Sequence, residues 1–162
     1  MINLAHPLTW IDCIECMAAS DNVVRSGLTP KFKDVDTLVN MLTYNHGPAD
    51  AQILSGVPFK GSKVTTLYDP PIREFAVLKT ELSLMTEKED VTKGLNGPSL
   101  LIVTGGEGSI QVVDNTSTVA KKDEEEEESL VTGSVFFVGA GVSVLLKAGQ
   151  EGSLTVYRAF CE

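Results

Sequence analysis

The residues best suited to chemistry lie in a polar stretch between apolar runs, over residues 15–34. Arg25 is the strongest candidate, because its guanidinium is a rigid fork of N–H donors that matches a phosphate, a carboxylate or a negatively charged transition state. Glu15 interrupts an apolar run, where a carboxylate could transfer a proton or orient a neighbouring group. Arg25 and Lys31 together could form the cationic pocket that a phosphorylated substrate needs.

Each of these residues also has a purely structural interpretation. Arg25 could form ion pairs with Asp21 and Asp34 that only hold a loop together. Glu15 could be a paired, buried carboxylate, and Lys31 could lie on a solvated surface. The residue types alone leave both interpretations open.

Candidate metal ligands are scattered along the chain. His6 is a lone histidine near the amino terminus, and His46 lies in a Gly-Pro loop without companion ligands. Cys13 and Cys16 form a C-x-x-C pair, but residues three apart on a strand face opposite sides of the sheet. We therefore expect two buried thiols there, and neither a shared metal site nor a disulfide.

The elements that would position these residues begin with a strand. Apolar residues over 10–17, interrupted by Asp12 and Glu15, predict a strand that ends near Ala19. A loop rich in Asp, Asn, Gly and Pro follows, and such a loop can hold Arg25 in a set position.

A short helix is predicted near residues 35–44, because apolar residues recur there at helical spacing and Asp34 or Asp36 is available as the N-cap. Its apolar stripe is expected to pack on the sheet. Glycine and proline then recur so often over residues 45–71 that we predict a long loop.

Residues 72–162 carry the pattern of an all-β unit, with alternating apolar residues and closely spaced glycine-rich turns. Leu100–Val113 is predicted to form a hairpin whose turn lies at Gly105–Gly108. An acidic run predicts a solvated loop over 121–129. The other predicted strands span residues 76–84, 135–138, 142–146 and 154–157.

The composition bounds the class of protein. A chain of 162 residues with 43% apolar residues is long enough for one ordinary domain with its own core. Six of the acidic charges lie in Asp123–Glu128, so the net charge of −9 leaves −3 for everything else (−9 + 6 = −3), and no basic face for nucleic acid is expected. Three cysteines favour a reducing compartment, and no run reaches the length of a membrane span. We expect a monomeric, cytoplasmic protein.

Several runs resemble the carboxy-terminal part of eukaryotic type I mannose-6-phosphate isomerases, which are zinc enzymes of the cupin class. The resemblance covers nearly the whole chain in the same order. It is carried by Asp12-Cys13-Ile14-Glu15-Cys16-Met17-Ala18, Ser20-Asp21-Asn22-Val23-Val24-Arg25, Gly27-Leu28-Thr29-Pro30-Lys31, Tyr68-Asp69-Pro70-Pro71, Phe75 and Lys79-Thr80-Glu81.

The resemblance implies a fold that is mostly β, a cupin-like jelly roll with one short helix. Residues 1–71 would complete the family's catalytic half, and residues 72–162 would form its carboxy-terminal jelly roll. The implied reaction interconverts mannose 6-phosphate and fructose 6-phosphate, in carbohydrate metabolism and GDP-mannose supply.

The resemblance also implies roles for single residues. Arg25 matches an active-site residue that can stabilise charge on an enediol-like transition state. Lys31 matches a position near the sugar phosphate. His6 has the spacing of one of four zinc ligands, although its flanking residues differ from the family's, and the other three ligands lie upstream of this chain.

Because one imidazole cannot make a four-coordinate site, we expect weak zinc binding or none, and no isomerase activity, from this chain alone. The rival hypothesis is a noncatalytic cupin-like module that binds a protein or a sugar.

Overall fold

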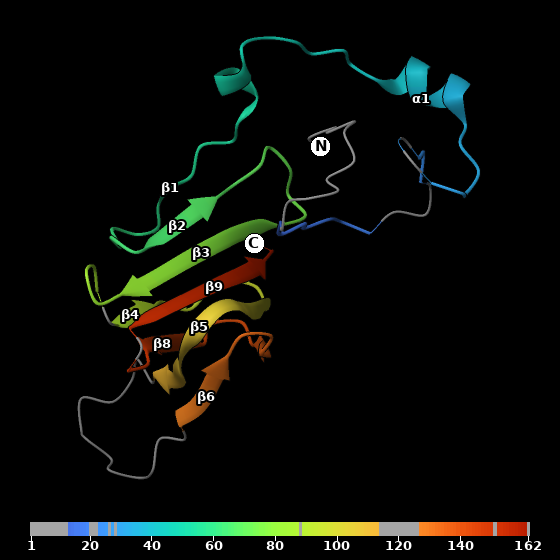
Figure 1. Ribbon diagram of the computed structural model, residues 1–162. Coiled ribbons are helices and arrows are strands. Elements are labelled where there is room, and N and C mark those ends of the chain that lie inside the picture. Colours follow the sequence, from blue (N-terminus) through green and yellow to red (C-terminus); the bar gives the residue numbers. More distant parts are fainter. Residues whose placement is uncertain are drawn as a thin grey trace. The chain divides into compact units, whose positions relative to one another are not determined.

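A computed structural model of the chain describes residues 13–19, 23–25, 27, 29–87, 89–113, 127–150 and 152–161. The chain divides into two compact units, one up to Ile53 and one from Leu54 onward. Figure 1 shows the chain and labels most of its helices and strands.

The first unit contains one α-helix, α1 (Val35–Met41), and one 3-10 helix, η1 (Ala49–Gln52). Asp34 is the N-cap of α1, because its carboxylate accepts hydrogen bonds from the Thr37 backbone N–H at 3.0 Å and from the Thr37 hydroxyl at 2.7 Å. The helix prediction is confirmed. Within the first unit the apolar stripe of α1 is not buried, since α1 has no buried residue and the Val35 and Val39 side chains are exposed. Its packing on the sheet stays a prediction.

The strand predicted to end near Ala19 is not formed over the described residues 13–19, which adopt no regular structure. A strand needs a neighbour that accepts and donates its backbone hydrogen bonds, and no described segment pairs with these residues. Cys13 is exposed and Cys16 is half-buried, so the expectation of two buried thiols is also wrong.

The second unit is built from nine strands that form one sheet. The strands are β1 (Val57–Pro58), β2 (Thr65–Tyr68), β3 (Ala76–Ser83), β4 (Glu89–Thr92), β5 (Ser99–Val113), β6 (Glu127–Val131), β7 (Val135–Val138), β8 (Ser143–Ala148) and β9 (Ser153–Phe160). All pairings are antiparallel. The order runs β1-β2-β3-β9-β5-β8-β4, with β6 and β7 also paired to β5. Figure 1 shows β2, β3, β9 and β5 side by side.

The prediction of a long loop over residues 45–71 is therefore wrong in part. β1 and β2 lie inside it, and β2 pairs with β3 along its whole length, from Thr65 opposite Thr80 to Tyr68 opposite Val77. Pro58 lies within β1 opposite Thr66, and the other glycines and prolines of this segment lie outside the two strands.

A single long strand, β5, replaces the predicted hairpin. Its first half pairs with β9 and β7, its second half pairs with β8 and β6, and a register shift lies between Val103 and Gly105. The glycines allow neighbouring backbones to approach: a Cβ on Gly106 would meet the Ser153 carbonyl oxygen at 2.0 Å, and one on Gly108 would meet that of Lys147 at 2.0 Å. The glycine run therefore bends the strand instead of reversing it.

Because β5 bends, the sheet curls and its two halves enclose one main core. This core contains Val64, Leu82, Leu101, Val103, Ile110, Leu130, Val138, Val144, Leu146, Leu154 and Val156. A second cluster, near the end of the sheet, contains Phe59, Ala76, Leu78, Leu95 and Phe160. The predicted mostly β fold of cupin type with one short α-helix is confirmed.

A polar network ties the β1–β2 turn to β4. The Asp90 carboxylate accepts hydrogen bonds from the Ser62 hydroxyl at 3.1 Å and from the Thr65 hydroxyl at 2.7 Å. The Thr65 hydroxyl also lies 2.8 Å from that of Thr80. The Asp90 carboxylate of β4 thus accepts from one turn hydroxyl and one β2 hydroxyl, and the Thr80 hydroxyl of β3 joins the network through Thr65.

The acidic loop predicted over 121–129 is shorter than expected at its end, because β6 begins at Glu127. The Glu127 carboxylate accepts a hydrogen bond from the Ser109 hydroxyl and lies 3.6 Å from Lys147 Nζ. The rest of the predicted loop, residues 121–126, lies outside the described residues. Among the described helices, none is both long and apolar enough to cross a membrane.

Candidate functional site

The predicted site residues with described positions all lie in the first unit. Arg25 is half-buried, whereas Glu15 and Lys31 are exposed. The Lys31 backbone N–H donates to the Thr29 hydroxyl at 3.3 Å, which shapes the loop locally. His6 lies outside the described residues.

The structural interpretations of these residues are tested only in part, because Lys31 is exposed as that interpretation expects and Asp21 lies outside the described residues. The ion pairs among described residues are Lys63–Glu87, Lys79–Glu81 and Lys147–Glu127, so Arg25 is in none of them. The Asp34 carboxylate caps α1, and the hydrogen bonds from the Thr37 backbone and hydroxyl lower its pKa. Glu15 is exposed and is therefore not a buried carboxylate. The catalytic roles of Arg25 and Glu15 stay predictions.

The described residues do not fit a zinc site. They contain no group of three or more His, Cys, Asp or Glu side chains close enough to hold a metal ion. Cys13, Cys16 and Cys161 are free thiols, and burial raises the pKa of Cys16, which disfavours the thiolate that binds zinc.

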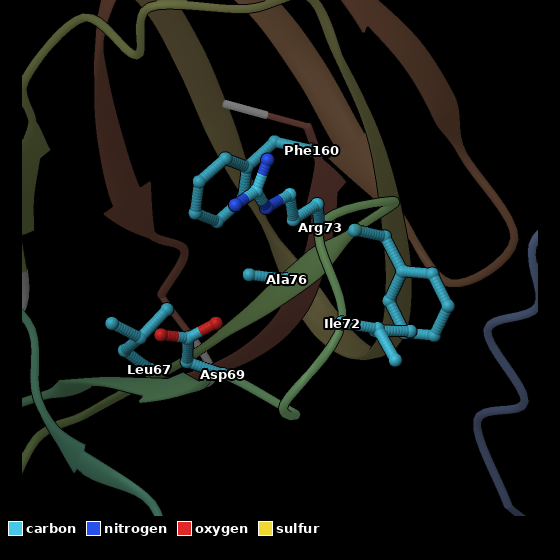
Figure 2. A pocket seen from close by; sticks show the side chains of 7 residues that line it. Leu67, Asp69, Ile72, Arg73, Ala76 and Phe160 are labelled. Atoms are coloured by element: carbon cyan, nitrogen blue, oxygen red, sulfur yellow. The ribbon is translucent and has the colours of Figure 1, made fainter. Parts of the chain in front are cut away.

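A pocket of about 250 Å³ lies in the second unit, where the connection from β2 to β3 passes the end of β9. Its lining residues are Leu67, Asp69, Ile72, Arg73, Phe75, Ala76 and Phe160. Figure 2 shows Asp69 and Arg73 on opposite sides of Ala76. A tight turn at the two prolines, with the Ile72 N–H donating to the Pro70 carbonyl at 2.7 Å, brings these side chains around one hollow.

This pocket is lined by one negatively and one positively charged side chain. Asp69 and Arg73 are both exposed, and neither belongs to an ion pair among the described residues. A carboxylate in the same small hollow weakens the attraction of Arg73 for a phosphate dianion. The Tyr68-Asp69-Pro70-Pro71 run marked this segment in the sequence, but no residue pattern predicted that it frames a pocket.

Arg158 is a buried charge that the sequence did not reveal. Its side chain is 3% exposed, and its Nε–H donates to the Ser99 hydroxyl at 2.8 Å. Neither Nη1 nor Nη2 has a hydrogen-bond partner among the described residues. Burial lowers the pKa of Arg158 to about 10, so the guanidinium is still charged at neutral pH. Only its alternation with the apolar residues of β9 could have signalled that it points inward.

Known proteins resemble this chain over most of its length. Residues 66–115 match the phosphomannose isomerase type I C-terminal family. The chain is 48% identical over 158 residues to the mannose-6-phosphate isomerase of Candida albicans, an alignment that covers 93% of this chain and 34% of that protein. It is 47% identical over 161 residues to that of Cryptococcus neoformans, which covers 99% of this chain and 34% of that protein.

Solved structures agree with the sequence comparison. A phosphomannose isomerase from Salmonella typhimurium, bound to its substrate (f6p) and zinc, is 26% identical with a TM-score of 0.63, and the match covers 90% of this chain and 32% of that one. A point mutant of the same enzyme is 27% identical with a TM-score of 0.65. The chain spans about a third of the length of the curated relatives that it matches. In sequence and in fold, the chain is similar to about a third of a mannose-6-phosphate isomerase, and its residues 66–115 match the type I C-terminal family.

Proposed function

We propose that this chain is part of a zinc-dependent isomerase that interconverts mannose 6-phosphate and fructose 6-phosphate, and that it is inactive by itself. The observation that supports this proposal most is the alignment of 93% or more of the chain with mannose-6-phosphate isomerases at nearly half identity. A cytoplasmic location and a monomeric state belong to the same proposal.

The residues of this chain would act from the first unit. The Arg25 guanidinium would donate hydrogen bonds to oxygens that become negatively charged while a proton moves between adjacent sugar carbons. Glu15 would transfer that proton or orient the group that does, and Lys31 would bind the phosphate. His6 would be the zinc ligand from this chain. Zinc, when bound, would polarise the sugar carbonyl.

Asp34, one of the two expected structural partners of Arg25, accepts hydrogen bonds from Thr37 and forms no ion pair with Arg25 among the described residues. Arg25 as a residue is half-buried, which favours stronger hydrogen bonds than those of a fully solvated side chain. An interaction that forms only in the transition state raises kcat, whereas a clamp on the phosphate that is equal in both states changes KM.

The test is a chimera in which this chain replaces the matching carboxy-terminal third of the Candida albicans enzyme. We expect Arg25→Ala to lower kcat about 100-fold with little change in KM, as for a lost oxyanion donor. Arg73→Ala is the matched control, because it removes an exposed guanidinium from the other unit. An unchanged kcat with a raised KM would make Arg25 a phosphate clamp instead.

The rival proposal, a binding module without catalysis, has one supporting observation, the pocket at Asp69 and Arg73. It predicts that the isolated chain binds a ligand and that the chimera has no turnover. The same two preparations therefore separate the two functions.

A further inference from the structure

An apolar row crosses the outer face of the sheet, on the side away from the core. By register, Phe137 of β7 lies opposite Leu100 of β5, Leu100 lies opposite Ala159 of β9, Ala159 lies opposite Val77 of β3, and Val77 lies opposite Tyr68 of β2. Residues that lie directly opposite each other point to the same face of a sheet, so these five form one continuous row.

A second row lies beside the first. Val135 of β7 lies opposite Ile102 of β5, which lies opposite Tyr157 of β9 and then Lys79 of β3. Lys79 forms an ion pair with Glu81 at 2.9 Å, and this hydrogen bond raises its pKa. Glu81, on the same strand, therefore neutralises the charge of Lys79 at the border of the two apolar rows.

The rows are most exposed at β7 and β5. The exposed fractions are 72% for Phe137, 57% for Leu100, 61% for Val135 and 37% for Ile102. β7 pairs only with β5 among the described strands, so Val135 and Phe137 lie at an edge of the sheet, with Leu100 and Ile102 on the next strand. The alternate residues of the same strands, such as Leu101 and Val138, point into the core. The side chains of the outer face are not part of that core.

We propose that this outer face, formed by Leu100, Ile102, Val135 and Phe137, is the docking surface for the amino-terminal two thirds of the isomerase fold. This inference rests on the proposed function. The matched relatives are about three times as long as this chain, so a complete isomerase contains a large body that must contact this unit. Permanent interfaces are apolar, as this face is, and a contiguous apolar surface on a soluble domain marks a contact site.

The other occupants fit less well. A sugar phosphate needs a cation, and the nearest one in these rows, Lys79, is already paired. A second copy of this chain would bury the same face against itself and would do so more completely as the protein concentration rises.

The test measures the burial of single side chains by thiol labelling. Phe137→Cys and, as a matched control, Val112→Cys are made in the isolated chain and in the Candida albicans chimera. Val112 is 59% exposed and lies on the other half of β5, outside both rows. Modification of the peptide that carries each new cysteine is followed by mass spectrometry, so the native cysteines do not interfere.

We expect the new thiol at position 137 to react at least about tenfold more slowly in the chimera than in the isolated chain, since a factor of ten corresponds to about 1.4 kcal/mol of contact. The thiol at position 112 should react equally in both. Equal rates at position 137 would overturn the proposal, and so would protection in the isolated chain that grows with its concentration. Protection at position 137 in a folded but inactive chimera would uphold docking and reject the proposed activity.

Discussion

The two units of this chain differ in how they are held together and in what they carry. The sheet unit has a core with fully buried side chains such as Leu101 and Leu130, whereas no described residue up to Ile53 is buried. Yet the predicted site residues Arg25 and Lys31 lie in the unit without a core among its described residues. The buried core and the predicted chemistry thus belong to different units.

The largest expected effect on stability comes from the core of the sheet unit, compared with an exposed position on α1. Leu101→Ala should lower the free energy of unfolding of the sheet unit by about 2–5 kcal/mol, because a fully buried leucine leaves a cavity. Val39→Ala, at a 50% exposed position on α1, should change it by less than about 0.5 kcal/mol. Urea unfolding of both variants measures the difference, and equal losses would show that the first unit shares the core.

The bend of β5 gives the next contrast. Gly108→Ala should destabilise the sheet by more than about 2 kcal/mol, because its Cβ would meet the Lys147 carbonyl oxygen at 2.0 Å. Gly105→Ala is the matched control on the same strand, since its nearest neighbour is Thr155 at 3.9 Å. Thermal unfolding should separate the two variants, and a tolerated Gly108→Ala would disprove the close approach of β5 and β8.

Arg158 tests the cost of a buried charge in the sheet unit. Arg158→Met should be neutral or stabilising by about 1–4 kcal/mol, because the guanidinium is buried with one hydrogen bond. The folded-state pKa is lowered, so the penalty is complete below about pH 10 and is relieved as pH rises above it. The advantage of Arg158→Met should shrink there. A loss of several kcal/mol would indicate a partner that completes the hydrogen bonds of Arg158.

The smallest effect is expected in the first unit. Asp34→Ala removes the N-cap and should reduce the helical signal in circular dichroism without moving the unfolding midpoint of the sheet. Because the pKa of Asp34 is lowered in the folded state, the wild-type cap is present above its ordinary pKa and is lost as the pH falls through the folded value. A shift of the sheet midpoint would couple the two units.

Sequence patterns predicted the elements whose information is local. The alternation over 76–84 and the polar N-cap at Asp34 both specify short-range geometry, and β3 and α1 form as expected. The glycines at 105–108 suggested a turn, because a pattern of residue types does not say whether glycine permits a reversal or the close approach of a distant backbone. β1 and β2 were missed because the glycines and prolines around them predicted a loop, although these residues are compatible with short paired strands.

The candidate site was predicted by resemblance more than by geometry. Arg25 and Lys31 were selected by their motifs, and the structure adds only that Arg25 is half-buried. The pocket at Asp69 and Arg73 and the buried Arg158 depend on which strands become neighbours, and that information lies far apart along the chain.

The central claim is that this chain supplies isomerase function only as part of a larger fold. A coupled assay with mannose 6-phosphate and zinc, run on the isolated chain and on the Candida albicans chimera, tests it most directly. We predict no turnover by the isolated chain, because it spans only about a third of the length of its matched relatives, and clear turnover by the chimera. Zinc-dependent turnover by the isolated chain, or a folded chimera without activity, would contradict it.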